Sequence, residues 1–151
     1  MADARPELPL DPDEPPPHLT GAGVALVFVG GVLGTGARYG VDEAVGPWGL
    51  WPAATFCVNV VGAFLLGALI EGLARRGPDI GGRLRARLLL GTGFLGAFTT
   101  YSALAVGADQ LLRDGHAWVG VAYAAGSVLV GFVASTLGIW AAAAQHRGAA
   151  R

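Results

Sequence analysis

The chain has 151 residues, of which 53% are hydrophobic and only 14% are charged, whereas soluble domains average about 25% charged residues. The net charge of −1 gives no reason to expect nucleic-acid binding, and a single cysteine argues against a disulfide framework or a zinc site. Together with a mean hydropathy of +0.53, this composition predicts an integral membrane protein with one domain.

Residues 1–20 have a different composition from the rest of the chain. They hold six of the nine prolines and five acidic residues. Such a segment cannot bury enough apolar surface to fold, so we expect a disordered or extended, solvated tail. A proline-rich ligand for a partner domain is the less favoured alternative.

Four apolar segments follow, at about 22–39, 52–73, 88–112 and 117–144. Each is long enough to cross the hydrocarbon core, which takes about 20 helical residues. Tryptophans lie near the segment ends, where membrane proteins form aromatic belts: Trp48, Trp51, Trp118 and Trp140. The sequence therefore predicts an all-α fold with a four-helix transmembrane domain at 21–145 and a short tail at 146–151.

The arginines indicate how these four spans are oriented. Four spans place both termini and the loop after the second span on one side of the membrane. That side carries eight arginines, against Arg38 and Arg113 on the other side. The eight are Arg5, Arg75, Arg76, Arg83, Arg85, Arg87, Arg147 and Arg151. The bias predicts cytoplasmic termini.

The stretch 91–102 lies inside the third span and contains three glycines, three threonines and one serine. A continuous helix gains nothing from this composition, because each glycine costs about 1 kcal/mol relative to alanine. One interpretation is a break near the middle of the span, whose freed backbone groups serve binding or conduction. The other is close packing of helices through small residues.

Other polar side chains also lie within the spans. Arg38 is expected either to anchor at the interface, with Asp42 as a partner, or to attract an anion. Asn59 needs a partner on a neighbouring helix or in a polar pathway, and shares a helix face with Thr55 and Gly62. In the fourth span a stripe of polar and small residues starts with Tyr123 and Ser127. The stripe either makes contacts between helices or forms one wall of a pore.

No span carries a carboxylate at mid-depth, as a proton-coupled pump usually needs. Nor does the chain hold a nucleophile–base pair or a cluster of metal-activating ligands. We therefore expect a passive pathway or an assembly subunit rather than an enzyme or a pump.

Three blocks of residues together resemble the CrcB/Fluc family of fluoride channels. They are Gly30-Gly31-x-x-Gly34-x-x-Ala37-Arg38-Tyr39, Thr55-x-x-x-Asn59-x-x-Gly62-x-Phe64-x-x-Gly67 and Gly93-Phe94-x-Gly96-x-x-Thr99-Thr100-Tyr101-Ser102. The blocks fall in the right spans and order, and the match covers about residues 22–144.

The resemblance implies an antiparallel, dual-topology dimer with two pores along its interface. It also implies a structural Na⁺ ion at the centre, held by the backbone carbonyls of Gly96 and Thr99 in the broken third span of both subunits. The ion pathway would then include side chains from all four spans, with Arg38 drawing anions to a vestibule: Arg38, Asn59, Tyr101, Ser102, Tyr123 and Ser127.

Two departures from the family pattern qualify this picture. Where the family has two phenylalanines, this chain has Tyr101 and Leu104, and Gly107 replaces an acidic residue. In addition, the arginine bias is not the near-neutral one that insertion in both orientations needs. The sequence therefore favours a paralogous partner of opposite topology over a homodimer.

The function we predict is passive efflux of cytoplasmic fluoride through the plasma membrane, which gives fluoride resistance. One alternative is a non-conducting or half-active subunit of a heterodimeric fluoride channel. Another, from a different class, is a small four-helix multidrug exporter.

Overall fold

The structure is a computed structural model that describes residues 20–149, with side chains described up to residue 146. The predicted N-terminal tail lies outside the described residues except for Thr20. The predicted C-terminal tail begins inside the last helix, whose described part ends at Ala149.

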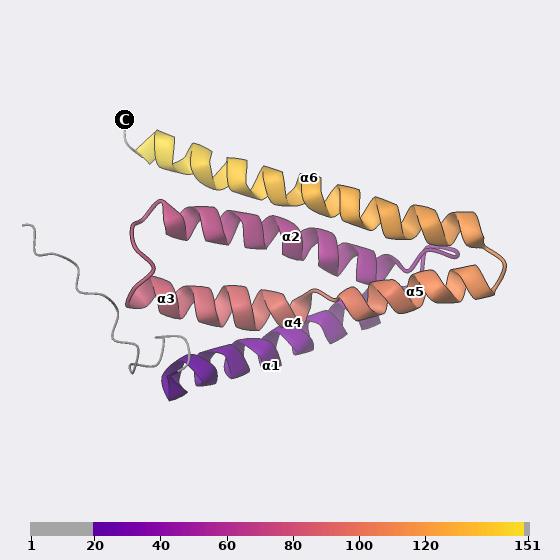
Figure 1. Cartoon of the computed structure of the whole chain (residues 1–151), viewed down its shortest axis with the longest axis horizontal. Coiled ribbons are helices and arrows are strands. Elements are labelled where there is room, and N and C mark those ends of the chain that lie inside the picture. The colour runs from indigo at the N-terminus through magenta and orange to yellow at the C-terminus, as the bar shows by residue number, and fades with distance from the viewer. Residues whose placement is uncertain (1–19, 150–151) are drawn as a thin grey trace, which may run out of the picture.

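All regular elements in the described part of the chain are helices, apart from an isolated bridge between Trp48 and Trp51. Figure 1 shows the helices running side by side as four spans. The elements are α1 (Gly21–Ala44), α2 (Ala53–Ala74), α3 (Gly82–Ala86), the π-helix η2 (Arg87–Leu95), α4 (Gly96–Phe98), α5 (Tyr101–Arg113) and α6 (Ala117–Ala149). Elements α3 to α5 together form the third span.

The prediction of four membrane-spanning helices is confirmed. Within the described residues, four helical stretches are long and apolar enough to cross a membrane. The first is longer than its apolar segment, because α1 continues through the exposed Asp42 and Glu43 to Ala44. A helix does not need apolar residues once it has left the hydrocarbon, so the apolar segment gives only a minimum length.

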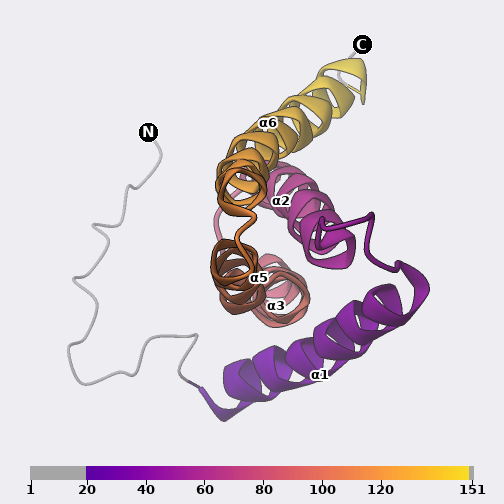
Figure 2. The ribbon, with the colours of Figure 1, turned by 90° about the vertical axis from the view of Figure 1, so that its right-hand side faces the viewer.

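The spans pack in a definite order. α2 packs along α6, α1 packs against η2 and α4, and α5 packs against α6. As a result, α1 and α6 lie at opposite edges of the molecule, with α2 and the third span between them (Figure 2).

Glycines allow the closest of these contacts. A Cβ atom added at Gly30 or Gly34 of α1 would collide with the backbone carbonyl oxygen of Leu89 or Phe94, respectively. A Cβ atom at Gly138 of α6 would collide with the carbonyl oxygen of Phe64 in α2. Close helix packing through small residues therefore occurs in two places, α1 with the third span and α2 with α6.

Two buried apolar clusters flank the middle of the third span. One consists of Val58, Leu95 and Phe98, and the other contains Leu104, Leu111 and Tyr123. The short segment Thr99–Thr100 lies between them, so packed side chains hold it in place on both sides along the span.

Candidate functional site

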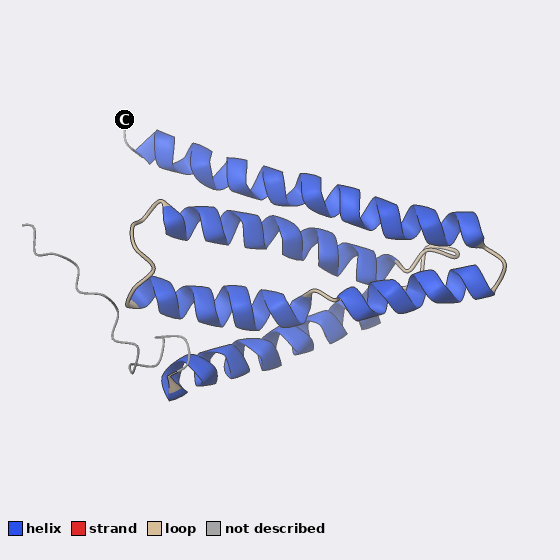
Figure 3. Ribbon diagram, in the orientation of Figure 1, coloured by secondary structure: helices blue, strands red, loops and turns tan. Residues whose placement is uncertain are grey.

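Two threonines interrupt the helical backbone of the third span. Thr99 (φ −79°, ψ 159°) and Thr100 (φ −150°, ψ 122°) are both extended, between the end of α4 and the start of α5. Figure 3 shows this segment as a loop within the span. Inside a membrane the freed backbone groups must find partners in the protein, in water or in an ion.

Asn59 of α2 provides two of those partners. Its Nδ2 donates to the carbonyl oxygen of Thr100 at 2.9 Å, and its Oδ1 accepts from the amide of Thr100 at 2.8 Å. Gly62, one turn further along α2, lies against the Thr99 side chain. The shared face of Asn59 and Gly62 predicted from sequence is thus the face that contacts the interruption, and the partner of Asn59 is a neighbouring helix.

The interruption leaves a set of carbonyl oxygens without their usual helical donors. The amide of Thr99 still donates to Leu95 at 3.0 Å. The next amide, that of Thr100, donates to Asn59 instead of Gly96, and that of Ala103 donates to Thr100 Oγ1 at 3.2 Å instead of the Thr99 carbonyl. The C-terminal end of α4 therefore presents free carbonyl oxygens, which carry partial negative charge.

The start of α5 has the opposite polarity. Thr100 is its N-cap, and Thr100 Oγ1 also lies 3.2 Å from Ser102 Oγ. Tyr101 and Ser102 follow this cap, where a helix has no acceptors of its own for its first backbone amides. A helix N-terminus with free amides favours an anion. Within a few residues, the chain thus presents one end that suits a cation and another that suits an anion.

A cleft opens beside the interruption. It has a volume of about 190 Å³ and is lined by Asn59, Thr99, Thr100, Tyr101 and Leu104. Tyr101 projects outward and is 83% exposed, whereas Leu104 is only 9% exposed and packs in the core. The two positions that depart from the family pattern therefore lie in different environments, although both reach the cleft.

Tyr101 and Leu104 also line a larger apolar groove between α5 and α6. Its volume is about 630 Å³, and its other walls are alanines and aliphatic residues of the two helices. The cleft beside Asn59 thus continues into an apolar face that no other described residues of this chain cover.

Arg38 lies on α1 next to Ala37, which packs against the cluster of Val58, Leu95 and Phe98. Its Nε atom is buried and has no hydrogen-bond partner in the described part of the chain. Among the described residues no ion pair joins Arg38 to Asp42. The structure therefore lacks the Asp42 partner that the anchoring interpretation includes.

Tyr123 and Ser127 lie on the buried face of α6. Tyr123 is fully buried and contacts Trp51 edge-on, with ring centroids 5.4 Å apart. Its hydroxyl is buried beside the Thr55 side chain, without a hydrogen bond of good geometry among the described residues. Ser127 donates to the carbonyl oxygen of Tyr123 at 2.7 Å, the local bond by which a helical serine satisfies itself.

The structure therefore brings some predicted site residues together and leaves others apart. Asn59, Thr99, Tyr101 and Ser102 belong to elements that meet at the interruption, and Gly96 is one turn before it. Tyr123 shares a core cluster with Leu104. Arg38 belongs to α1, beside Ala37, which packs against the cluster that contains Phe98. The importance of Thr100, which makes every bond to Asn59, was not foreseen from sequence, nor was η2.

The comparisons with known proteins agree with one another. Residues 25–139 match the family described as "CrcB-like protein, Camphor Resistance (CrcB)". The chain is 48% identical over 124 residues to "Fluoride-specific ion channel FluC 2" of Leifsonia xyli, covering 82% of this chain and 86% of that one. It is 47% identical over 120 residues to a fluoride-specific ion channel FluC of Chlorobium luteolum, covering 79% and 91%.

Proposed function

Because the chain belongs to the CrcB-like family, we infer that it is a subunit of a fluoride-specific ion channel and not an enzyme. The relatives named above support this function and do not favour the exporter alternative or the non-conducting alternative. Passive efflux fits the chemistry of the ion. Hydrogen fluoride that enters a cell from acid dissociates inside, and a channel lets the trapped anion leave.

The observation that carries this proposal is the meeting of Asn59 with the interrupted third span. The amides at the start of α5 supply positive potential there for an anion, and Arg38, whose buried Nε is unpaired, adds a positive charge from α1. We assign Asn59, Tyr101, Ser102, Tyr123 and Ser127 to the ion pathway. The Tyr123 hydroxyl, buried beside the Thr55 side chain, supports its place there, because a buried polar group without a well-formed hydrogen bond gains from a passing ion or water.

We further propose that two subunits pair in antiparallel orientation and that the partner of this chain is a paralogue of opposite topology. Two observations support pairing. Tyr101 is largely exposed, and it borders an uncovered apolar groove on α5 and α6. The arginine bias supports one fixed orientation, with both termini in the cytoplasm.

One experiment in liposomes tests both the function and the partner. Liposomes loaded with fluoride are prepared with this chain alone and with this chain plus a paralogous partner, and efflux is followed with a fluoride electrode. We expect efflux of fluoride, and not of chloride, when both subunits are present, and little efflux from this chain alone. Robust efflux from the chain alone would keep the function but reject the obligatory partner. Absence of fluoride efflux from both samples would contradict the function.

A structural Na⁺ ion is the remaining part of the proposal. The carbonyls of Gly96 and Thr99 fit such an ion, because their helical donors are engaged elsewhere and oxygen ligands suit a hard cation. The dipole at the end of α4 adds to this preference. When bound, the ion would supply the positive charge that neutralises these carbonyls.

Removing Na⁺ is expected to destabilise the assembled channel. A ligand present at 100 times its dissociation constant stabilises the folded state by about 2.7 kcal/mol. The melting temperature in detergent should therefore rise with Na⁺ concentration at constant ionic strength, with N-methylglucamine as the replacement cation. A melting temperature that depends only on ionic strength would reject the Na⁺ site while leaving the fluoride function open.

A further inference from the structure

A second groove lies between α2 and α6, at the end of the molecule that holds the α2–α3 loop. We call it the α2–α6 groove. It has a volume of about 200 Å³, and its lining includes the apolar Phe64, Ala68 and Leu69 at one end and the polar Arg76, Gln145 and His146 at the other. It is separate from the interruption in the third span, with which it shares no residue.

The shape of the groove is elongated along the helices. Phe64 and Gly72 both line it and are eight residues apart on α2, so its apolar part extends about 12 Å along the helix axis. Arg76 lies just beyond the end of α2 at Ala74. The polar end therefore lies where the span leaves the hydrocarbon, and the apolar end lies within the hydrocarbon.

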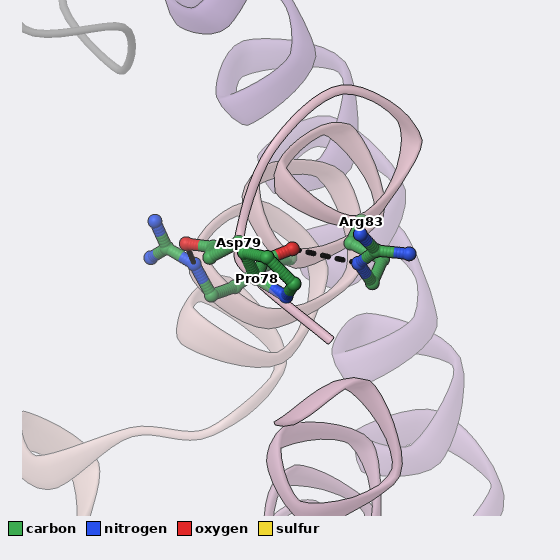
Figure 4. A network of polar contacts seen from close by, with 4 residues as sticks. Pro78, Asp79 and Arg83 are labelled. Carbon is green, nitrogen blue, oxygen red and sulfur yellow. Dashed lines mark hydrogen bonds and ion pairs between the residues drawn. The ribbon is translucent and has the colours of Figure 1, made fainter. Parts of the chain in front are cut away.

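Arg76 is available to an outside partner, unlike three neighbouring arginines. Arg75 pairs with Glu71 at 2.5 Å, and Arg87 pairs with Asp79 at 2.6 Å. Figure 4 shows Arg83 donating to the carbonyl oxygen of Pro78, at 2.7 Å. The Arg76 side chain makes no ion pair or hydrogen bond with any described residue, although its backbone amide donates to the carbonyl oxygen of Leu73.

We propose that the α2–α6 groove binds an anionic phospholipid, with its phosphate at Arg76 and one acyl chain along Phe64, Ala68 and Leu69. The charge of Arg76 complements a phosphate, and Gln145 and His146 add polar partners at the same end. The long apolar part favours a lipid over a soluble anion, which would leave that surface unmatched. The membrane also presents anionic lipid at this depth, next to a loop rich in arginine.

The test uses the full chain in neutral detergent, titrated with phosphatidylglycerol or phosphatidylcholine and followed by native mass spectrometry. We expect a preference for phosphatidylglycerol that Arg76→Gln weakens about fivefold. Arg85→Gln is the matched control, because Arg85 lies in α3, directly after the same loop, and has an exposed side chain that pairs with no described residue and does not line the groove. It should leave the affinity unchanged.

A second pair of variants tests the apolar part. A side chain at Gly72 meets nothing within 4 Å of its Cβ atom, so Gly72→Leu should fold and fill the groove. We expect it to weaken binding although Arg76 is intact. Gly21→Leu, at the start of α1 and equally open, is the control.

Three results would overturn the proposal. Equal losses in Arg76→Gln and Arg85→Gln would mean diffuse attraction to the whole loop. Competition by millimolar inorganic phosphate would mean a small-anion site. Unchanged binding in Gly72→Leu would mean that the acyl chain lies elsewhere. Fluoride efflux is not part of this readout, so the result does not depend on the proposed function.

Discussion

Asn59→Ala is expected to destabilise the chain by about 2 kcal/mol, because it leaves the partly buried amide and carbonyl of Thr100 without a partner, and each such group costs at the low end of the about 1–3 kcal/mol of a fully buried one. Both hydrogen bonds are short, 2.8 and 2.9 Å. They fix the position at which α4 ends and α5 begins. Thermal unfolding in detergent measures the loss of stability.

The same variant should slow fluoride efflux at least tenfold, which corresponds to about 1.4 kcal/mol in the barrier. Misplacing Thr100 moves the carbonyls before it and the amides after it, which are the groups that we propose face the two ions. Cys57→Ala is the matched control, since Cys57 is two residues away on α2 and partly buried. Unchanged stability and efflux in Asn59→Ala would mean that the two bonds to Thr100 do not hold the site.

Gly34→Ala is also expected to reduce stability, by about 3 kcal/mol or more, through overpacking. The added methyl group would collide with the carbonyl oxygen of Phe94. A backbone carbonyl cannot rotate away as a side chain can, so α1 must move off the third span. The free energy of unfolding measures this cost, and fluoride efflux reports whether the displaced α1 still supports the site.

Gly36→Ala supplies the control for this prediction on the same helix. A Cβ atom at Gly36 meets nothing within 4 Å, and alanine is the better helix former by about 1 kcal/mol. This variant should be neutral or slightly stabilising. Similar losses in Gly34→Ala and Gly36→Ala would mean that glycine matters through helix flexibility rather than through close contact.

Much of the fold could be predicted from the sequence because the bilayer imposes strong rules. Apolar length predicted the four spans, and the glycines of residues 91–102 indicated close helix packing as one alternative, which Gly93 shows against α1. Asn59 was singled out because an amide in a membrane must have a partner. Each of these inferences depends on composition and spacing along one helix, which a sequence displays directly.

The rest depends on contacts between distant segments. Thr100 looks like any other threonine until Asn59, 41 residues away, is placed beside it. The π-helix η2 has no local signature that separates it from an α-helix, although its nine residues include Gly91 and Gly93. Arg76 is left without an ion pair because neighbouring arginines pair with the nearby carboxylates. The sequence of the loop does not determine which arginine pairs with which carboxylate.

Because α2 packs mainly against α6, α2 is synthesised and inserted before the helix that it packs against has been made. α2 ends at Ala74 and α6 begins at Ala117, and ribosomes add about 5–20 residues per second. For several seconds α2 therefore sits in the bilayer before its main partner exists. Its face around Gly67, which is buried against Ser135 in the finished protein, meets lipid or the insertion machinery until the last helix arrives.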